Sequence, residues 1–107
     1  MSQYARPPER PQPAPNREIH RVRVSISGRV QGVGYRFHTQ QMARSLGVTG
    51  WVRNLPDGRV EAVFEASSDR LERAVQWCHR GSPAAEVSQV ETQTETPEGL
   101  RGFEICY

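Results

Sequence analysis

The residues best suited to chemistry lie in one short run, where three glycines precede an arginine between residues 28 and 36. Glycine lets the backbone turn sharply and aim several N–H groups at one point. The helix expected to begin there adds its own unpaired N–H groups and the positive end of its dipole. Arg36 adds a forked positive charge in the first helical turn. The run predicts an anion site; a glycine-rich turn without a ligand is the open alternative.

The segments on either side of this run have clear periodicities. Apolar residues alternate with polar ones from Val22 to Ile26, which predicts a half-buried strand. From Tyr35 to Leu46, apolar and small residues recur on one face of a helix, and Gly47 follows where a helix commonly ends. The glycine run therefore joins a strand to a helix.

The rest of the chain completes a familiar order of elements. Strands are expected over residues 48–54, 59–66, 87–94 and 103–107, and a second helix begins near Ser68 or Asp69 and ends before Gly81. Residues 55–58 form a turn, because proline presets φ and glycine accepts a positive φ. The order predicts an α+β fold, a ferredoxin-like βαββαβ sandwich with a short fifth strand. We expect an antiparallel sheet with two helices on one face.

Composition separates the first twenty residues from the rest of the 107-residue chain. Residues 1–20 are rich in proline and poor in apolar residues, which predicts a flexible tail, and residues 21–107 are expected to form one domain. Each part has a net charge of +1, so no nucleic-acid partner is expected. No apolar stretch is long enough for a membrane span. We expect a cytoplasmic monomer without a membrane partner.

The two cysteines, Cys78 and Cys106, stand 28 residues apart and lack the spacing of a metal motif. No metal site and no cofactor are therefore expected. A second polar candidate is Asn54, at the end of its strand just before the turn. It either faces the glycine run or simply ends its strand by bonding to its own backbone. The sequence leaves both possibilities open.

Two long motifs together resemble the acylphosphatase family. The first is Gly28-Arg29-Val30-Gln31-Gly32-Val33-Gly34-Tyr35-Arg36. The second is Leu46-Gly47-Val48-Thr49-Gly50-Trp51-Val52-Arg53-Asn54, followed by Asp57-Gly58-Arg59-Val60. The resemblance spans roughly residues 20–107, and Tyr35 is a mild variation where the family often has phenylalanine.

The resemblance implies an enzyme that hydrolyses the carboxyl–phosphate bond of a small-molecule acyl phosphate with water. The family's catalytic arginine falls on Arg36 and its catalytic asparagine on Asn54. The implied phosphate-binding residues are Gln31, Gly32, Val33, Gly34, Tyr35 and Arg36, mainly through backbone N–H groups, with Asn54 positioning the water. No metal is needed, because a carboxylate is a good leaving group.

Two alternatives to an enzyme remain. The same motifs fit a non-catalytic module that binds phosphate or carbamoyl phosphate. The same fold also serves RNA-binding domains, which stack bases on aromatic residues of the central strands. Here residues 21–27 have no aromatic residue and residues 59–66 have only Phe64, so RNA binding is disfavoured.

Overall fold

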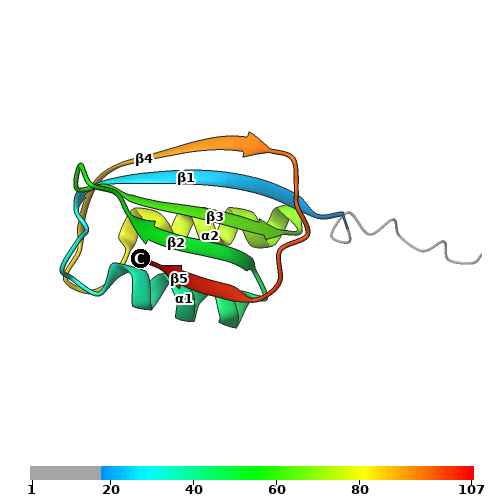
Figure 1. Cartoon of the computed structure of the whole chain (residues 1–107), viewed down its shortest axis with the longest axis horizontal. Helices are drawn as coiled ribbons and strands as arrows, with labels where there is room; N and C mark the ends of the chain where they lie inside the picture. The colour runs from blue at the N-terminus through cyan, green and yellow to red at the C-terminus, as the bar shows by residue number, and fades with distance from the viewer. Residues whose placement is uncertain (1–17) are drawn as a thin grey trace, which may run out of the picture.

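The computed structural model describes residues 18–107. Its elements follow the expected order (Figure 1) and are β1 (His20–Arg29), α1 (Tyr35–Leu46), β2 (Thr49–Asn54), β3 (Val60–Ala66), α2 (Ser68–Arg80), β4 (Glu86–Glu95) and β5 (Phe103–Cys106). The expected tail lies outside the described residues except for residues 18–20, of which His20 already opens β1. No helix in the described part of the chain is long and apolar enough to cross a membrane.

The five strands form one sheet in the order β4-β1-β3-β2-β5. The expectation of an antiparallel sheet is correct for β4, β1, β3 and β2, but β5 pairs with β2 in parallel, so the sheet is mixed. The reason is the route of the chain. β4 ends beside Arg21, at the same end of the sheet where β2 begins, and the chain crosses that end before entering β5.

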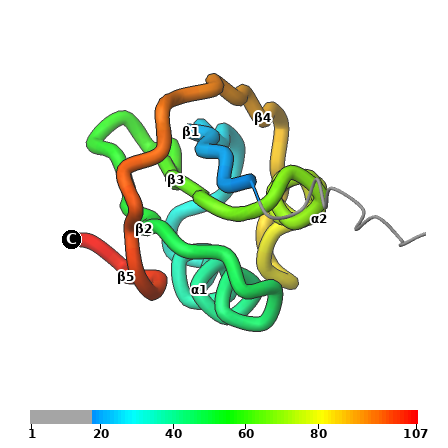
Figure 2. The backbone as a smooth tube through the Cα atoms, turned by 90° about the vertical axis from the view of Figure 1, so that its right-hand side faces the viewer, coloured from blue at the N-terminus to red at the C-terminus, as the bar shows by residue number. Residues whose placement is uncertain are grey.

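Both helices pack on one face of the sheet, as expected, and Figure 2 shows the sheet curving around them. The face of α1 predicted from its helical spacing does point inward: Tyr35, Thr39 and Ala43 are buried, while Met42 and Leu46 are half-buried. From α2, Leu71, Ala74 and Cys78 are buried, and every one of these buried helix residues except Thr39 belongs to the core cluster with the apolar face of the strands. This core holds the ends of β1 and β2 in fixed positions.

A buried ion pair fastens the segment that leads into β5. Glu65 of β3 and Arg21 of β1 are almost fully buried, and Arg21 Nη1 donates to Glu65 Oε2 at 2.8 Å. The same carboxylate accepts the backbone N–H groups of Glu98, Gly99 and Leu100 at 2.7 to 3.0 Å. Glu65 thereby fixes residues 98–100, which lie in the segment that connects β4 to β5 at the edge of the sheet.

Replacing Glu65 with glutamine should lower the free energy of unfolding by about 3 kcal/mol, because it leaves the buried Arg21 cation short of a partner. Burial raises the pKa of Glu65, but the N–H groups of Glu98, Leu100 and Gly99 and the Arg21 guanidinium outweigh it and hold the pKa below its ordinary value of 4.5. The carboxylate therefore stabilises the fold above that ordinary value. This contribution is lost as the pH falls through the lower folded-state pKa.

Urea titrations of both proteins from pH 7 down to pH 2 measure this effect. The difference in the free energy of unfolding between wild type and Glu65→Gln should be largest at neutral pH and should shrink as the pH falls. Asp57→Asn, which removes an exposed ion pair with Arg59, is the control and should be nearly neutral at pH 7. Equal stabilities of wild type and Glu65→Gln at pH 7 would contradict the assignment.

Candidate active site

The glycine run forms a loop whose N–H groups are free. Gly32 has φ 75° and Gly34 has φ 76°, in the left-handed region that favours glycine. The space around a Cβ at Gly32 is open, so backbone conformation rather than crowding selects glycine there. In the described chain, none of the N–H groups of residues 31–37 donates to a protein acceptor. We call these N–H groups the anion cradle.

The carbonyl groups of the loop are held by neighbouring segments. Ser82, almost fully buried after α2, donates its hydroxyl to the Val33 carbonyl at 2.9 Å. The backbone N–H of His38 donates to the Gly34 carbonyl at 3.1 Å, and the His38 ring Nδ1 lies 2.9 Å from the same oxygen. With these oxygens bound to protein, the loop leaves its N–H groups for a ligand.

Arg36 lies between the cradle and β5. Its Nη1 donates to the Cys106 carbonyl at 3.3 Å, and its Cζ lies 4.7 Å from the centre of the Tyr107 ring. A guanidinium has five N–H donors, so this one bond leaves most of them available. β5 therefore fixes the position of the arginine without using up its hydrogen-bonding capacity.

Asn54 lies beside the glycine loop. Of the two arrangements that the sequence left open, it adopts the one that faces the loop. It is half-buried at the end of β2 and lines the same cavity as Gly32, Gly34 and Arg36. Within residues 18–107 its side chain makes no hydrogen bond to its own backbone or to any other protein group. The amide is therefore free to bind a ligand or water.

The Gln31 side chain ties the loop to the hairpin that carries Asn54. Its Nε2 donates to the Leu55 carbonyl at 2.8 Å and to the Arg59 carbonyl at 2.9 Å. These two residues face each other across the base of the turn, where Leu55 N–H also donates to the Arg59 carbonyl at 2.8 Å. One amide thus sets the spacing between the cradle and Asn54.

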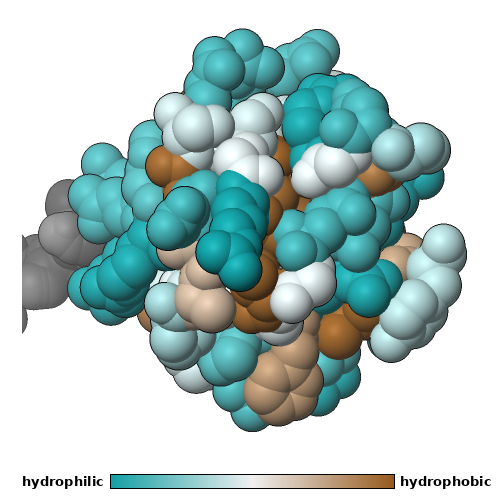
Figure 3. Space-filling view, turned by 90° about the vertical axis from the view of Figure 1, so that its left-hand side faces the viewer, coloured by the Kyte–Doolittle hydropathy of each residue, from teal (hydrophilic) through white to brown (hydrophobic). Residues whose placement is uncertain are grey.

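The loop, α1, β2 and β5 enclose a cavity of about 240 Å³ at the end of the sheet where β2 and β5 finish. Figure 3 views the molecule from this end and shows apolar side chains exposed among hydrophilic ones. The cavity is lined by Val30, Gly32, Gly34, Tyr35, Arg36, Phe37, Asn54, Ile105 and Tyr107. Arg36 is the one charged side chain of this set, which contains no Asp or Glu from the described residues. The cavity suits a small anion.

Of the predicted phosphate-binding residues, Tyr35 lines the cavity, whereas Gln31 and Val33 are not part of its lining. The Tyr35 side chain is buried toward α2, where its hydroxyl donates to the Cys78 carbonyl at 2.7 Å. The backbone N–H of Tyr35 is therefore the group of this residue that can bind a ligand. Val33 likewise packs its side chain against the core. Phosphate binding by these residues stays a prediction, and it concerns their backbone N–H groups.

The cysteines offer no nucleophile to this cavity. Cys78 is buried in the core, and burial raises the pKa of its thiol to about 12. Cys106 is half-buried, and both thiols are free. In residues 18–107, no cluster of three His, Cys, Asp or Glu side chains is arranged to hold a metal ion.

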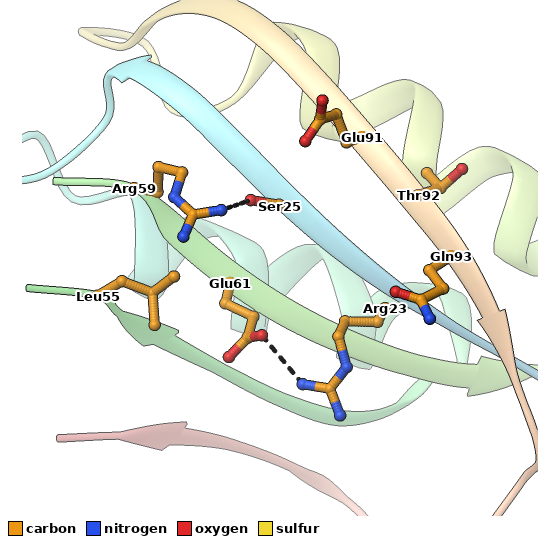
Figure 4. A pocket seen from close by; sticks show the side chains of 8 residues that line it. All are labelled: Arg23, Ser25, Leu55, Arg59, Glu61, Glu91, Thr92 and Gln93. Carbon is orange, nitrogen blue, oxygen red and sulfur yellow. Dashed lines mark hydrogen bonds and ion pairs between the residues drawn. The ribbon is translucent and has the colours of Figure 1, made fainter. Parts of the chain in front are cut away.

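A larger hollow of about 610 Å³ lies on the other face of the sheet (Figure 4). Its arginines are already paired: Arg59 Nε donates to Asp57 at 2.8 Å, and Arg23 contacts Glu61 at 3.0 Å and Glu95 at 2.7 Å. With their charges balanced, these cations leave little attraction for an anion. The lining comprises Arg23, Ser25, Leu55, Arg59, Glu61, Glu91, Thr92 and Gln93.

The strands that an RNA-binding domain would use offer no stacking surface here. β1 contains no aromatic residue. Phe64 of β3 is fully buried, with its ring stacked on Phe103 at a centroid distance of 5.8 Å. Trp51 of β2 lies between the guanidinium groups of Arg23 and Arg53, at 5.6 and 5.2 Å from their Cζ atoms.

Besides the buried Val30, sequence reasoning missed three residues that line the cavity, namely Phe37, Ile105 and Tyr107. Phe37 follows Arg36 directly and lies off the buried stripe of α1, which marks it as a residue that packing does not require. The other two reach the site through the parallel pairing of β5 with β2. No local pattern in the sequence indicates that pairing.

Comparisons with known proteins find relatives both by sequence and by fold. A family model described as Acylphosphatase matches residues 22–105. An acylphosphatase from Trichormus variabilis is 58% identical over 95 residues, covering 89% of this chain and 94% of that protein. The structure of an acylphosphatase from Coxiella burnetii has a TM-score of 0.81 at 33% identity and covers 84% of this chain and 95% of that one. The Bacillus subtilis acylphosphatase structure has a TM-score of 0.80 at 36% identity, with coverages of 82% and 99%.

Proposed function

This chain belongs to the acylphosphatase family and hydrolyses acyl phosphates, and from that membership we propose that Arg36 binds the phosphoryl group while Asn54 positions the attacking water. The observation that carries the proposal is one cavity that joins free N–H groups, a guanidinium and a free amide. Both candidate residues lie within the part of the chain that the family model matches.

The cradle and Arg36 are suited to the charge of the transition state. In phosphoryl transfer the phosphorus is loosely bonded, and negative charge spreads over its equatorial oxygens. Backbone N–H groups and a forked guanidinium, fixed in advance, stabilise such charge without reorganising. The bond from Arg36 to the Cys106 carbonyl supports this role because it holds the fork in place before substrate arrives.

Asn54 is suited to placing water in line with the bond that breaks. Its amide both accepts and donates hydrogen bonds, and it has no protein partner in the described chain. The water oxygen forms a bond to phosphorus, and the phosphorus–oxygen bond to the acyl group breaks. The acyl carboxylate leaves with the electron pair, and a phosphoryl oxygen of the substrate takes the proton from water.

Phosphate release from benzoyl phosphate and acetyl phosphate, measured for wild type and Arg36→Ala side by side, tests this function. Wild type should release phosphate from both substrates, and the variant should release almost none. Undetectable release by wild type would favour a non-catalytic phosphate-binding module instead. The competing RNA-binding function would require salt-dependent binding to single-stranded RNA.

Residues 1–19 are proposed to be dispensable for catalysis. The cavity is built wholly from residues 30–107, and β1 begins at His20. A protein lacking residues 1–19 should keep the kcat and KM of the full chain for benzoyl phosphate within about twofold. A larger loss in steady-state kinetics would mean that the tail belongs to the functional unit.

The enzyme is further proposed to act as a monomer in the cytoplasm. Every described group that lines the cavity comes from one chain, so a second copy is not needed to complete the site. The two cysteines are free thiols, as is usual in a reducing compartment.

A further inference from the structure

Two of the three large apolar side chains that are exposed in the described chain lie at one cavity. Phe37 is 52% exposed and Tyr107 is fully exposed, and both line the cavity that holds Arg36. The third, Ile19, is 50% exposed just before β1, at the far end of the sheet. Single exposed apolar residues are common, but two that converge on a candidate active site are informative.

We propose that Phe37, Ile105 and Tyr107 form an acyl-group subsite, and that the enzyme prefers acyl phosphates whose acyl group is aromatic or otherwise apolar. This inference rests on the proposed function and deepens it. It names the part of the cavity that receives the leaving group and the chemical class of that group.

The lining of the cavity divides by chemistry into two parts. One part consists of the Gly32 and Gly34 backbone and Arg36, which suit an anion; the other consists of the three apolar side chains. In an acyl phosphate the two groups are joined through a single oxygen. A phosphoryl group held by the cradle therefore brings the acyl group onto neighbouring surfaces of the same cavity. Those surfaces contain no second charged side chain from the described residues, so a charged acyl group would find no partner.

Folding does not account for the position of Phe37. Its ring lies outside the core and makes a T-shaped contact with the neighbouring His38 ring at a centroid distance of 5.3 Å. Covering this ring with an apolar acyl group would remove both surfaces from water. Tyr107 has a second contact, with Arg36, so Phe37 is the cleaner residue to change.

The test compares kcat/KM for benzoyl phosphate and acetyl phosphate in wild type, Phe37→Ala and Ile19→Ala. Phe37→Ala should lower kcat/KM for benzoyl phosphate about fivefold, the range expected for one lost aromatic contact. Its kcat/KM for acetyl phosphate should fall by a smaller factor, because the methyl group is too small to gain much from the ring, so the ratio of the two kcat/KM values should fall. Ile19→Ala, the matched control, should leave both values unchanged, and Phe37→Leu should restore part of the preference.

A measurement on wild type alone does not depend on the folding of any variant. Phenylphosphonate should inhibit competitively with a Ki about fivefold lower than methylphosphonate. Equal Ki values, or an equal loss on both substrates in Phe37→Ala, would overturn the subsite and leave the proposed function intact. Failure of wild type to hydrolyse either substrate would overturn the proposed function itself.

Discussion

Arg36→Lys should lower kcat/KM for benzoyl phosphate roughly 10³-fold, the scale of losing a preorganised charge at the transferring phosphoryl group. An ammonium group is a compact point charge and cannot hold two oxygens as a planar fork does. It would also lose the fixed geometry that the Cys106 carbonyl and the Tyr107 ring give to the guanidinium. The competitive Ki of inorganic phosphate should rise in parallel.

Arg44 supplies a closely matched control for this substitution. It lies on the same helix, and its Nη2 donates to a carbonyl of the same strand, that of Phe103, at 3.3 Å. It does not line the cavity. Arg44→Lys should therefore keep nearly full activity. A similar loss in both variants would mean that Arg36 only helps β5 to dock.

Asn54→Ala should lower kcat about 10²-fold, since a water that is no longer held in line reacts far less often. The Ki of inorganic phosphate should change by less than about twofold, because the cradle and Arg36 remain. The melting temperature should also stay close to that of wild type, because the Asn54 side chain has no hydrogen-bond partner in the described chain. Steady-state kinetics with benzoyl phosphate and a thermal melt measure all three quantities.

Asp57→Ala is the control in the same hairpin. Asp57 is exposed at the turn, bonds to Arg59 and lies outside the cavity, so its loss should leave kcat unchanged. Wild-type turnover by Asn54→Ala would contradict the water-positioning role. A rise in the phosphate Ki comparable to the fall in kcat would place Asn54 in phosphate binding instead.

Most of the fold could be predicted because its signals are local. The alternation over 22–26 and the helical spacing from Tyr35 to Leu46 place their residues where the structure has them. The parallel pairing of β5 could not be predicted, since it depends on where the chain crosses after β4. The buried pair of Arg21 and Glu65 that fixes this crossover looks in the sequence like ordinary charges on alternating strands.

The candidate site was predictable in its parts and not in its assembly. Gly32, Gly34 and Arg36 lie within five residues of one another, so the sequence alone groups them. Asn54 comes close to them because β1 and β2 both pair with β3 and because Gln31 bonds to the hairpin that carries Asn54. The Gln31 contacts go to carbonyl oxygens, which every residue has, so no sequence pattern marks them. Ile105 and Tyr107 were missed for a similar reason, because the pairing of β5 with β2 brings them to the cavity.

The position of β5 also couples completion of the sheet to completion of the candidate active site. β5 follows every other strand in the chain, yet it pairs with β2, about fifty residues earlier. While β5 is still within the ribosome, β2 has an open edge, and Arg36 lacks the carbonyl that holds it. Because Phe103 of β5 is also a core residue, docking of this last strand completes the core and fixes Arg36 in the same step.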